Sequence, residues 1–327
     1  MASIRFRNNK WQARVTRKGY HFETRTFLTK QDAERWSRSI ESNMDKGSYI
    51  STSSAENTTL REIIDLYIKE VSPTHRGCEP EVIKLKAMQR HKMASLSLAN
   101  VTPKVIADYR DERLEICKAN TVIRDLAVLS SIFTHCIKEW SFAINNPVLN
   151  IRKPKMPLGR DRVLTKNEEE KLLHAMLPIR NRNIYMSHLT IVALETAMRR
   201  GELLKLEWQY INLQNRTAHL PMTKNGKSRT VPLSQRAIDE LKSMPRNINE
   251  KVFPINEAAM SYCFNRACAR AKVTGLHFHD LRHTAITRLS QKLPNLIELA
   301  SVTGHRNVQM LARYYHPKAE DLALKIR

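Results

Sequence analysis

The sequence predicts a multidomain, mainly α-helical protein: a small β3α unit at residues 1–50, an all-α bundle at residues 58–150 and a mixed α+β domain at residues 160–327. Three observations predict this class. Apolar residues alternate along the first 27 positions and then change to helical spacing, which is typical of strands followed by helices. Two segments rich in turn-forming or basic residues, 48–58 and 151–163, divide the chain. A length of 327 residues suits two or three domains of about 100–200 residues each.

Residues 1–50 predict three short strands and one helix. The strand-like runs are residues 4–7, 11–15 and 22–27. The helix is expected from Lys30 to Lys46, ended by Gly47. Basic residues stud the strands: Arg5, Arg7, Lys10, Arg14, Arg17, Lys18 and Arg25. Such a sheet face can enter a DNA groove, although a solvated basic face is an equally good interpretation of these residues alone.

The middle of the chain predicts a bundle of some four helices. Residues 48–58 are rich in Ser and Thr and indicate a linker. Thr59 and Glu62 form a capping box that begins one helix, and Thr102 with Pro103 begins another. The apolar face of that second helix is expected to carry Val105, Ile106, Tyr109, Leu114 and Ile116. A long helix follows from about residue 121 to 140, and the basic, Pro-containing segment 151–163 is expected to be an extended linker.

The last third predicts helices interrupted by a β-hairpin. A second capping box, Thr165 with Glu168, begins a helix that runs to about residue 177, and another helix is expected at residues 184–196. Residues 215–233 change to strand character around an Asn-Gly turn signal. Helices are expected to resume near Gln235, Ala258, His279, Leu296 and Asn307.

The charge balance favours a polyanionic partner. Lys and Arg number 55 against 32 Asp and Glu, which gives a net charge of +23. Nucleic acid is the leading candidate, anionic membrane surface is the weaker one, and a generic basic protein is the alternative on composition alone. No apolar run approaches the ~20 residues that span a bilayer, and the N-terminus lacks the apolar segment of a signal peptide. We therefore expect no membrane partner and a cytoplasmic location with the DNA.

The cysteines indicate neither a disulfide framework nor a zinc motif. They are odd in number and scattered: Cys78, Cys117, Cys136, Cys263 and Cys268. Buried or half-buried thiols in a reducing compartment are the expected state.

Candidate chemical residues gather in the last 165 positions. Arg199 follows a predicted helix end, where its planar guanidinium can hold a phosphate with Glu202 to orient it. Lys224 stands beside the predicted hairpin tip, and His279 and Arg282, three residues apart, share a helix face. Taken singly, the Arg and the Lys could be ordinary surface charges. The spacing of residues 277, 279 and 283 would also allow a metal site, but the adjacent guanidinium opposes a cation.

Another pattern pairs a Gly304-His305 dipeptide with Tyr314, nine residues later. Alone this spacing is weak, because tyrosine is usually a packing residue with a polar tip.

Together these patterns resemble the phage integrase, or tyrosine recombinase, family. TAMRRGELLKLEW resembles the family's T-G-x-R-x-x-E-L box, and TKNGKSRTVPL its hairpin lysine segment. HFHDLRHTAITRL resembles the H-x-L-R-H box, and TGHRNVQMLARYYH the L-G-H-x9-Y box. The resemblance covers residues 164–325. The middle region resembles the family's core-binding domain, and residues 1–50 resemble its arm-type DNA-binding domain. The motif sequences are most similar to those of phage and plasmid integrases and of shufflon invertases.

The resemblance implies a site without metal or nucleotide cofactor. Its catalytic residues would be Arg199, Lys224, His279, Arg282, His305 and the nucleophile Tyr314. The nine-residue spacing favours Tyr314 over Tyr315, and Glu202 would support the site. Ala197 stands where the family usually has Gly, which is expected to tighten a turn slightly.

The chemistry explains these residue types. The free pKa of tyrosine is near 10, so its phenolate is scarce at neutral pH. We expect two arginines and His305 to neutralise charge on the phosphate, His279 to help take the tyrosine proton, and Lys224 to protonate the departing 5′-oxygen. The resulting 3′-phosphotyrosine stores the bond energy, so rejoining needs no ATP.

By resemblance, the partners are double-stranded DNA recombination sites and a homo-tetramer formed on DNA, with DNA-bending accessory proteins as further candidates. Integration and excision of a mobile element is the favoured function; shufflon-like DNA inversion and a non-catalytic DNA-binding regulator are the alternatives. The tail after Tyr314 is expected to dock onto a neighbouring protomer.

Overall fold

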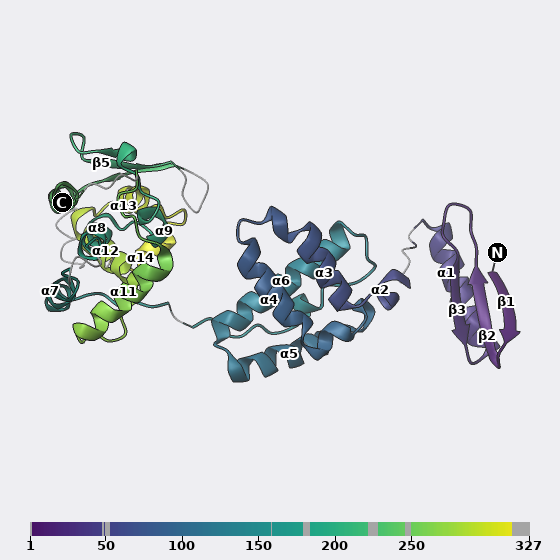
Figure 1. Ribbon diagram of the computed structural model, residues 1–327. Helices are drawn as coiled ribbons and strands as arrows, with labels where there is room; N and C mark the ends of the chain where they lie inside the picture. Colours follow the sequence, from purple (N-terminus) through teal and green to yellow (C-terminus); the bar gives the residue numbers. More distant parts are fainter. Residues whose placement is uncertain are drawn as a thin grey trace, which may run out of the picture. The chain divides into compact units, whose positions relative to one another are not determined.

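The computed structural model describes residues 2–47, 49, 53–157, 159–178, 184–221, 228–245 and 250–315 (Figure 1). The chain divides into two compact units, Met1–Leu158 and Gly159–Arg327. The division of the first unit into separate domains at residues 1–50 and 58–150 stays a prediction.

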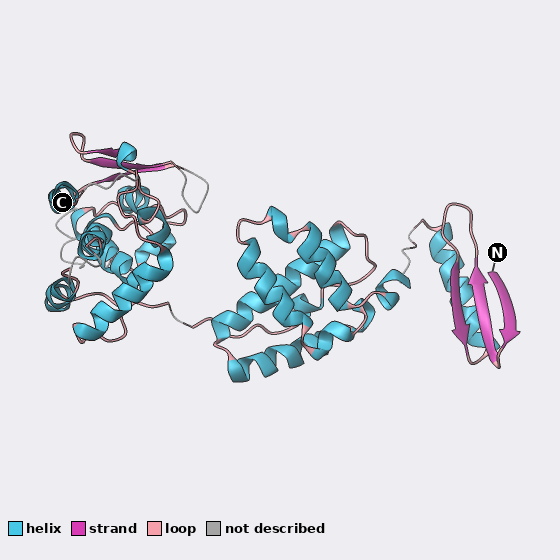
Figure 2. Ribbon diagram, viewed as in Figure 1, coloured by secondary structure: helices cyan, strands magenta, loops and turns pink. Residues whose placement is uncertain are grey.

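The first unit begins with the predicted sheet and helix. Three antiparallel strands in the order β1-β2-β3 precede helix α1: β1 Ala2–Arg7, β2 Lys10–Val15, β3 Glu23–Phe27 and α1 Lys30–Asp45. Figure 2 shows the strands in magenta beside this helix in cyan. Ala13 and Val15 of β2 are fully buried, as is Ala33 of α1, because side chains two apart on a strand share the face that the helix covers.

The register places basic side chains on the opposite face of this sheet. Arg5 pairs with Gln12 and Arg7 with Lys10, while Ser3 pairs with Arg14. These positions are out of phase with the buried Ala13, so they share the face that α1 leaves uncovered.

The helical part of the first unit packs around its own core. Its α-helices are α2 Ser53–Asn57, α3 Leu60–Glu70, α4 Cys78–Gln89, α5 Pro103–Ile116 and α6 Ala119–Lys138. Leu60, Ile64, Leu126 and Phe133 are fully buried in this core. The capping box of Thr59 and Glu62 is confirmed, and so is a helix that begins at Pro103.

Two expectations for this region need correction in part. The segment 48–58 is not linker throughout, because α2 forms within it and buries Ala55. The apolar face predicted for α5 is only partly right: Ile106 and Tyr109 are buried, but Leu114 and Ile116 are exposed.

The second unit combines helices with a three-stranded antiparallel sheet of order β4-β5-β6. Its helices are α7 Lys166–Ala175, α8 Met186–Thr196, α9 Arg200–Leu203, α10 Gln235–Ser243, α11 Glu257–Arg270, α12 Phe278–Lys292, α13 Leu296–Thr303 and α14 Gln309–Ala312. Its strands are β4 Ile211–Asn212, β5 Thr217–Leu220 and β6 Arg229–Pro232. The second capping box and the last two strands follow the prediction, whereas the two-residue β4 was missed.

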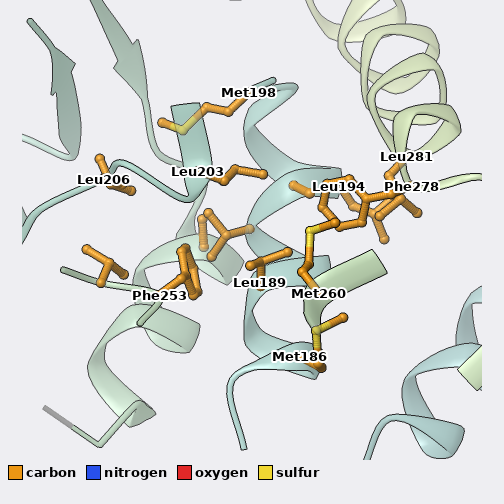
Figure 3. Packing of buried hydrophobic residues seen from close by; sticks show 14 of the residues in the cluster. Met186, Leu189, Leu194, Met198, Leu203, Leu206, Phe253, Met260, Phe278 and Leu281 are labelled. Carbon is orange, nitrogen blue, oxygen red and sulfur yellow. The ribbon is translucent and has the colours of Figure 1, made fainter. Parts of the chain in front are cut away.

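Two apolar clusters hold this unit together. The larger one surrounds α8, with Leu189, Leu203, Phe253 and Met260 packed together (Figure 3). A smaller cluster joins the end of α8 to α12, α13 and α14, and Tyr314 packs against its edge. The second cluster therefore fixes the segments that carry most of the predicted site residues.

The cysteines match the expected thiols. None of the five, all of which lie in described segments, forms a disulfide. Burial raises the pKa of the Cys136 thiol to about 12 and that of Cys268 to about 11. Within the described segments, no helix is both long and apolar enough to cross a bilayer.

Candidate active site

The site is built around a sharp turn between α8 and α9. Ala197 ends α8 in the left-handed region, with φ of +52°, and is completely buried. A residue with a Cβ costs roughly 1–2 kcal/mol in that conformation, so a glycine would form this turn with less strain than Ala197 does. The turn returns the chain to extended backbone at Arg199, just before α9.

One buried carboxylate organises two arginines. Glu202 accepts from the backbone nitrogen of Arg199 at 2.7 Å and from its Nη1 at 2.9 Å. Arg229 of β6 donates to both Glu202 oxygens, at 2.7 and 2.9 Å. Burial acts to raise the pKa of Glu202, but the bonds from Arg229 and Arg199 outweigh it and lower this pKa. Glu202 therefore stays ionised and holds both guanidinium groups.

Arg282 is a buried arginine of α12, only 4% exposed. It donates through Nη1 to the carbonyl of Ala197 and through Nη2 to that of Thr303 at 2.6 Å. Burial first, and then the charge of Arg199, lower its pKa to about 9, which still leaves the group charged at neutral pH. Arg199 also donates to the carbonyl of Gly304 at 2.9 Å, so both arginines meet the end of α13.

His305 follows Gly304, the residue that caps the end of α13. Its Nδ1 lies 2.7 Å from the hydroxyl of Thr303. Burial, followed by the charges of Arg282, Arg199 and Arg229, lowers its pKa to about 4. The imidazole is therefore neutral at pH 7 without DNA. The Thr303 hydroxyl donates to the Leu299 carbonyl at 2.7 Å, so Nδ1–H of His305 donates to the hydroxyl oxygen. Donation from Nε2 to a phosphate oxygen then requires the second ring proton, which the negative charge of a phosphate favours.

Tyr314 follows α14 and meets α12 twice. Its hydroxyl forms a hydrogen bond with Nδ1 of His283, and the two rings stack at 25°. Its carbonyl accepts from the hydroxyl of Ser290 at 2.9 Å. Burial raises the pKa of Tyr314, against the charges of Arg313 and Arg282. His279 packs edge-on against His283, with ring centroids 5.4 Å apart.

The start of the second unit is also tied to this region. Arg160 binds the buried Asp280 of α12 through two bonds, of 2.9 and 3.2 Å. The same arginine's carbonyl accepts from Arg313, the residue before Tyr314. The predicted linker segment thus contacts both α12 and the tyrosine segment from within the same unit.

The structure therefore brings Arg199, Arg282 and His305 together at the end of α13. Tyr314 contacts α12, the helix that carries both Arg282 and His279. Lys224 lies outside the described residues. Sequence reasoning missed Arg229 and His283, although both stand inside the quoted boxes. For His283 a signal existed, because it is four residues after His279 and so shares its helix face. In the described segments, no three His, Cys, Asp or Glu side chains cluster as metal ligands.

Sequence comparisons relate parts of both units to one protein family. The profile of the phage integrase family matches residues 162–321, and that of the phage integrase N-terminal domain matches residues 56–155. A shufflon-specific DNA recombinase of Escherichia coli is 40% identical, over 82% of this chain and 71% of its own length. A putative integrase/recombinase of Haemophilus influenzae is 34% identical, over 99% of this chain and 88% of its own.

Solved structures share the fold. The lambda integrase dimer bound to a COC′ core site superimposes with a TM-score of 0.67 and 21% identity, over 96% of this chain and 94% of that one. The Tn1549 transposon integrase, residues 82–397, in complex with circular intermediate DNA gives 0.68 and 16%, over 83% of this chain and 100% of that one.

Proposed function

Since this chain belongs to the phage integrase family of tyrosine recombinases, we propose that it cuts and rejoins duplex DNA at specific sites through a covalent bond to Tyr314. One observation carries this proposal: two arginines, His305 and Tyr314 reach one region from segments over a hundred residues apart in sequence, as the 105-residue separation of Arg199 and Gly304 illustrates. Such an arrangement of fixed positive donors beside a hydroxyl suits transfer of a phosphodiester.

Each of the six predicted residues receives a role in the proposed reaction, and that of His279 is to help take the tyrosine proton. The hydroxyl oxygen of Tyr314 attacks the phosphorus, and the bond to the 5′-oxygen breaks. Arg199 and Arg282 neutralise the non-bridging oxygens, and His305 donates a further hydrogen bond. Lys224 gives a proton to the departing 5′-oxygen. A 5′-hydroxyl from a partner duplex later attacks the 3′-phosphotyrosine and restores the DNA bond without ATP.

Glu202 and Arg229 are proposed to position the clamp. Glu202 holds Arg199 from both its backbone and side chain, and Arg229 keeps this carboxylate charged. Arg229 lies at the start of β6, two residues after the undescribed segment 222–227, which contains Lys224. The same ion pair would therefore connect the arginine clamp to the strand that follows the proposed general acid.

The net charge of +23 supports extended contact with DNA phosphates. We propose that the uncovered face of the β1-β2-β3 sheet, with Arg5, Arg7, Lys10 and Arg14, lies in a DNA groove as a separate arm-type domain at residues 1–50. The core-binding domain at 58–150 and the catalytic domain at 160–327 would hold the crossover site. Four protomers would assemble at this site, and DNA-bending accessory proteins are further candidate partners. The protein would be located with the DNA in the cell. Docking of the tail by Leu322 and Leu324 concerns residues outside the described ones.

Integration and excision of a mobile element is the proposed biological outcome. The basic β3α unit at the N-terminus supports it, because a second DNA-binding surface allows one protein to bind two kinds of site. Inversion is the second candidate, favoured by the 40% identity to a shufflon-specific recombinase. Plasmids that carry paired target sites in direct or inverted orientation separate the two: integrases excise direct pairs efficiently, whereas a dedicated invertase strongly prefers inverted pairs.

The catalytic proposal is tested by trapping. The protein is incubated with sheared DNA from its own source and denatured in SDS, and the attached fragments are sequenced, with Tyr314→Phe as the control. Fragments that cluster at one repeated sequence and are lost in the variant are the expected result. Equal trapping by the variant would contradict the role of Tyr314, and no trapping by either protein would favour the regulator.

A further inference from the structure

A histidine outside the predicted set contacts the proposed nucleophile. His283 lies one turn after His279 on α12, and its Nδ1 bonds to the hydroxyl of Tyr314, 31 residues later in the chain. The two ring planes lie 25° apart, and the ring centroids are 5.9 Å apart. Both segments are anchored, because Ser290 of α12 also holds the carbonyl of Tyr314.

We propose that His283 is a catalytic residue that accepts the phenolic proton of Tyr314 as its oxygen attacks the phosphorus. The proposal rests on the function proposed above and adds a group to it. In the forward step the O–H bond of Tyr314 breaks, the new bond to phosphorus forms, the bond to the 5′-oxygen breaks, and the proton passes to Nδ1 of His283. In the rejoining step His283 returns this proton as the tyrosine leaves.

The surroundings of His283 suit a proton acceptor at neutral pH. The charged and titratable groups facing it are His279, Asp280 and Arg282 on its own helix, and Arg313 and Tyr314 from the segment after α14. Burial first, then His279 and Arg313, lower the pKa of His283, with Asp280 opposing. The ring is therefore neutral at pH 7, and with its hydrogen on Nε2 it leaves Nδ1 open as an acceptor.

His279 is better placed to support His283 than to act on the tyrosine itself. Its ring meets His283 edge-on, whereas the bond to the tyrosine hydroxyl is made by His283. In this account His279 acts as a positioning residue toward the nucleophile, through its neighbour.

The test isolates the nucleophile side of the reaction. DNA with a sulfur atom in place of the bridging 5′-oxygen needs no proton on the leaving group, so its cleavage does not depend on a general acid. The cleavage rate of this substrate is measured from pH 6.5 to 8.5 for wild type, His283→Gln, His283→Asn and His279→Gln. His174→Gln, an exposed histidine of α7, is the matched control. Thermal melting and DNA binding confirm that each variant folds.

The expected loss in His283→Gln is about 100-fold at pH 7, the usual contribution of a general base. That loss shrinks about tenfold per pH unit upward, since the phenolate fraction below its pKa rises at that rate. His283→Asn stays slow, because an amide oxygen can hold the hydroxyl but cannot take its proton. His279→Gln loses less, and His174→Gln behaves as wild type.

Other outcomes would overturn the inference. A cleavage rate in His283→Gln within about threefold of wild type would overturn it. A rate loss that does not change with pH, or full activity in His283→Asn, would also overturn it, because each result indicates that His283 only packs against or positions the tyrosine. If wild-type protein forms a covalent complex through Tyr314 and the His283 variants cleave at the wild-type rate, this inference is refuted but the proposed function is not. No covalent complex in wild type would instead refute the proposed function, and the inference with it.

Discussion

Arg229→Ala is expected to destabilise the second unit strongly, because it leaves a buried carboxylate with one partner fewer. The side chains of Arg229 and Glu202 are 10% and 5% exposed, and two bonds of 2.7 and 2.9 Å join them. Breaking one partner of a buried pair costs about 3–5 kcal/mol, a large part of the roughly 5–15 kcal/mol that keeps a domain folded. Arg199 still holds Glu202 in the variant, so the lower end of that range is expected.

The same variant has a pH signature. The folded-state pKa of Glu202 lies below its ordinary 4.5, so the ion pair contributes stability above about pH 4.5 and loses it as pH falls through the folded pKa. The deficit of Arg229→Ala should therefore be full at pH 7 and smaller near pH 4.

Urea unfolding, followed by hydrogen exchange on peptides from α9, β6 and α13, measures this deficit within the second unit. Arg200→Ala is the control, because its partner Glu257 is 62% exposed and surface pairs contribute about 0–1 kcal/mol. A deficit below about 1 kcal/mol at pH 7, or one that does not change with pH, would refute the argument that Glu202 is a charged, buried organiser.

Three further predictions concern the clamp and the DNA contact. Arg282→Lys should slow covalent-complex formation by about 100–1,000-fold, because a single ammonium group cannot bind the Ala197 and Thr303 carbonyls and also face a phosphate. The rate is measured in a gel assay of the covalent complex, and a loss of less than tenfold would contradict this prediction. In His305→Gln, folding stability should decrease less than in wild type as the pH falls from about 6.5 to about 4. In wild type the folded protein keeps His305 neutral over this range, whereas the unfolded chain binds a proton there. Thermal melts that show the same pH dependence for both proteins would argue against a buried neutral ring. Binding to duplex DNA should weaken steeply with salt, at about −0.9 in the log–log slope per phosphate, and a slope as shallow as about −2 would exclude an encircling clamp.

Local chemistry made parts of the fold predictable. The capping boxes of Thr59 and Thr165 depend on residues three apart, so both helix starts could be placed from the sequence. The exposed Leu114 and Ile116 show the limit of apolar periodicity, because solvent tolerates an apolar side chain where no neighbour covers it. The short α2 depends on burial of Ala55, a tertiary contact that the Ser/Thr-rich composition conceals.

The site was predictable as a set of residues, but its pairings were not. Motif spacing selected Arg199, Arg282, His305 and Tyr314, and the structure brings the segments that carry them together. The contacts of Arg229 with Glu202 and of His283 with Tyr314 join residues 27 and 31 positions apart. Such contacts arise from the packing of β6 and α14 onto other elements, which no local pattern encodes.

The central claim, that Tyr314 is the nucleophile, is tested most directly by identifying the residue that carries DNA. Wild-type protein is trapped on its target, digested with protease and nuclease, and the peptide with a residual nucleotide is sequenced by mass spectrometry. We predict that the nucleotide is attached to Tyr314. Attachment to Tyr315, or to a residue of another segment, would contradict it.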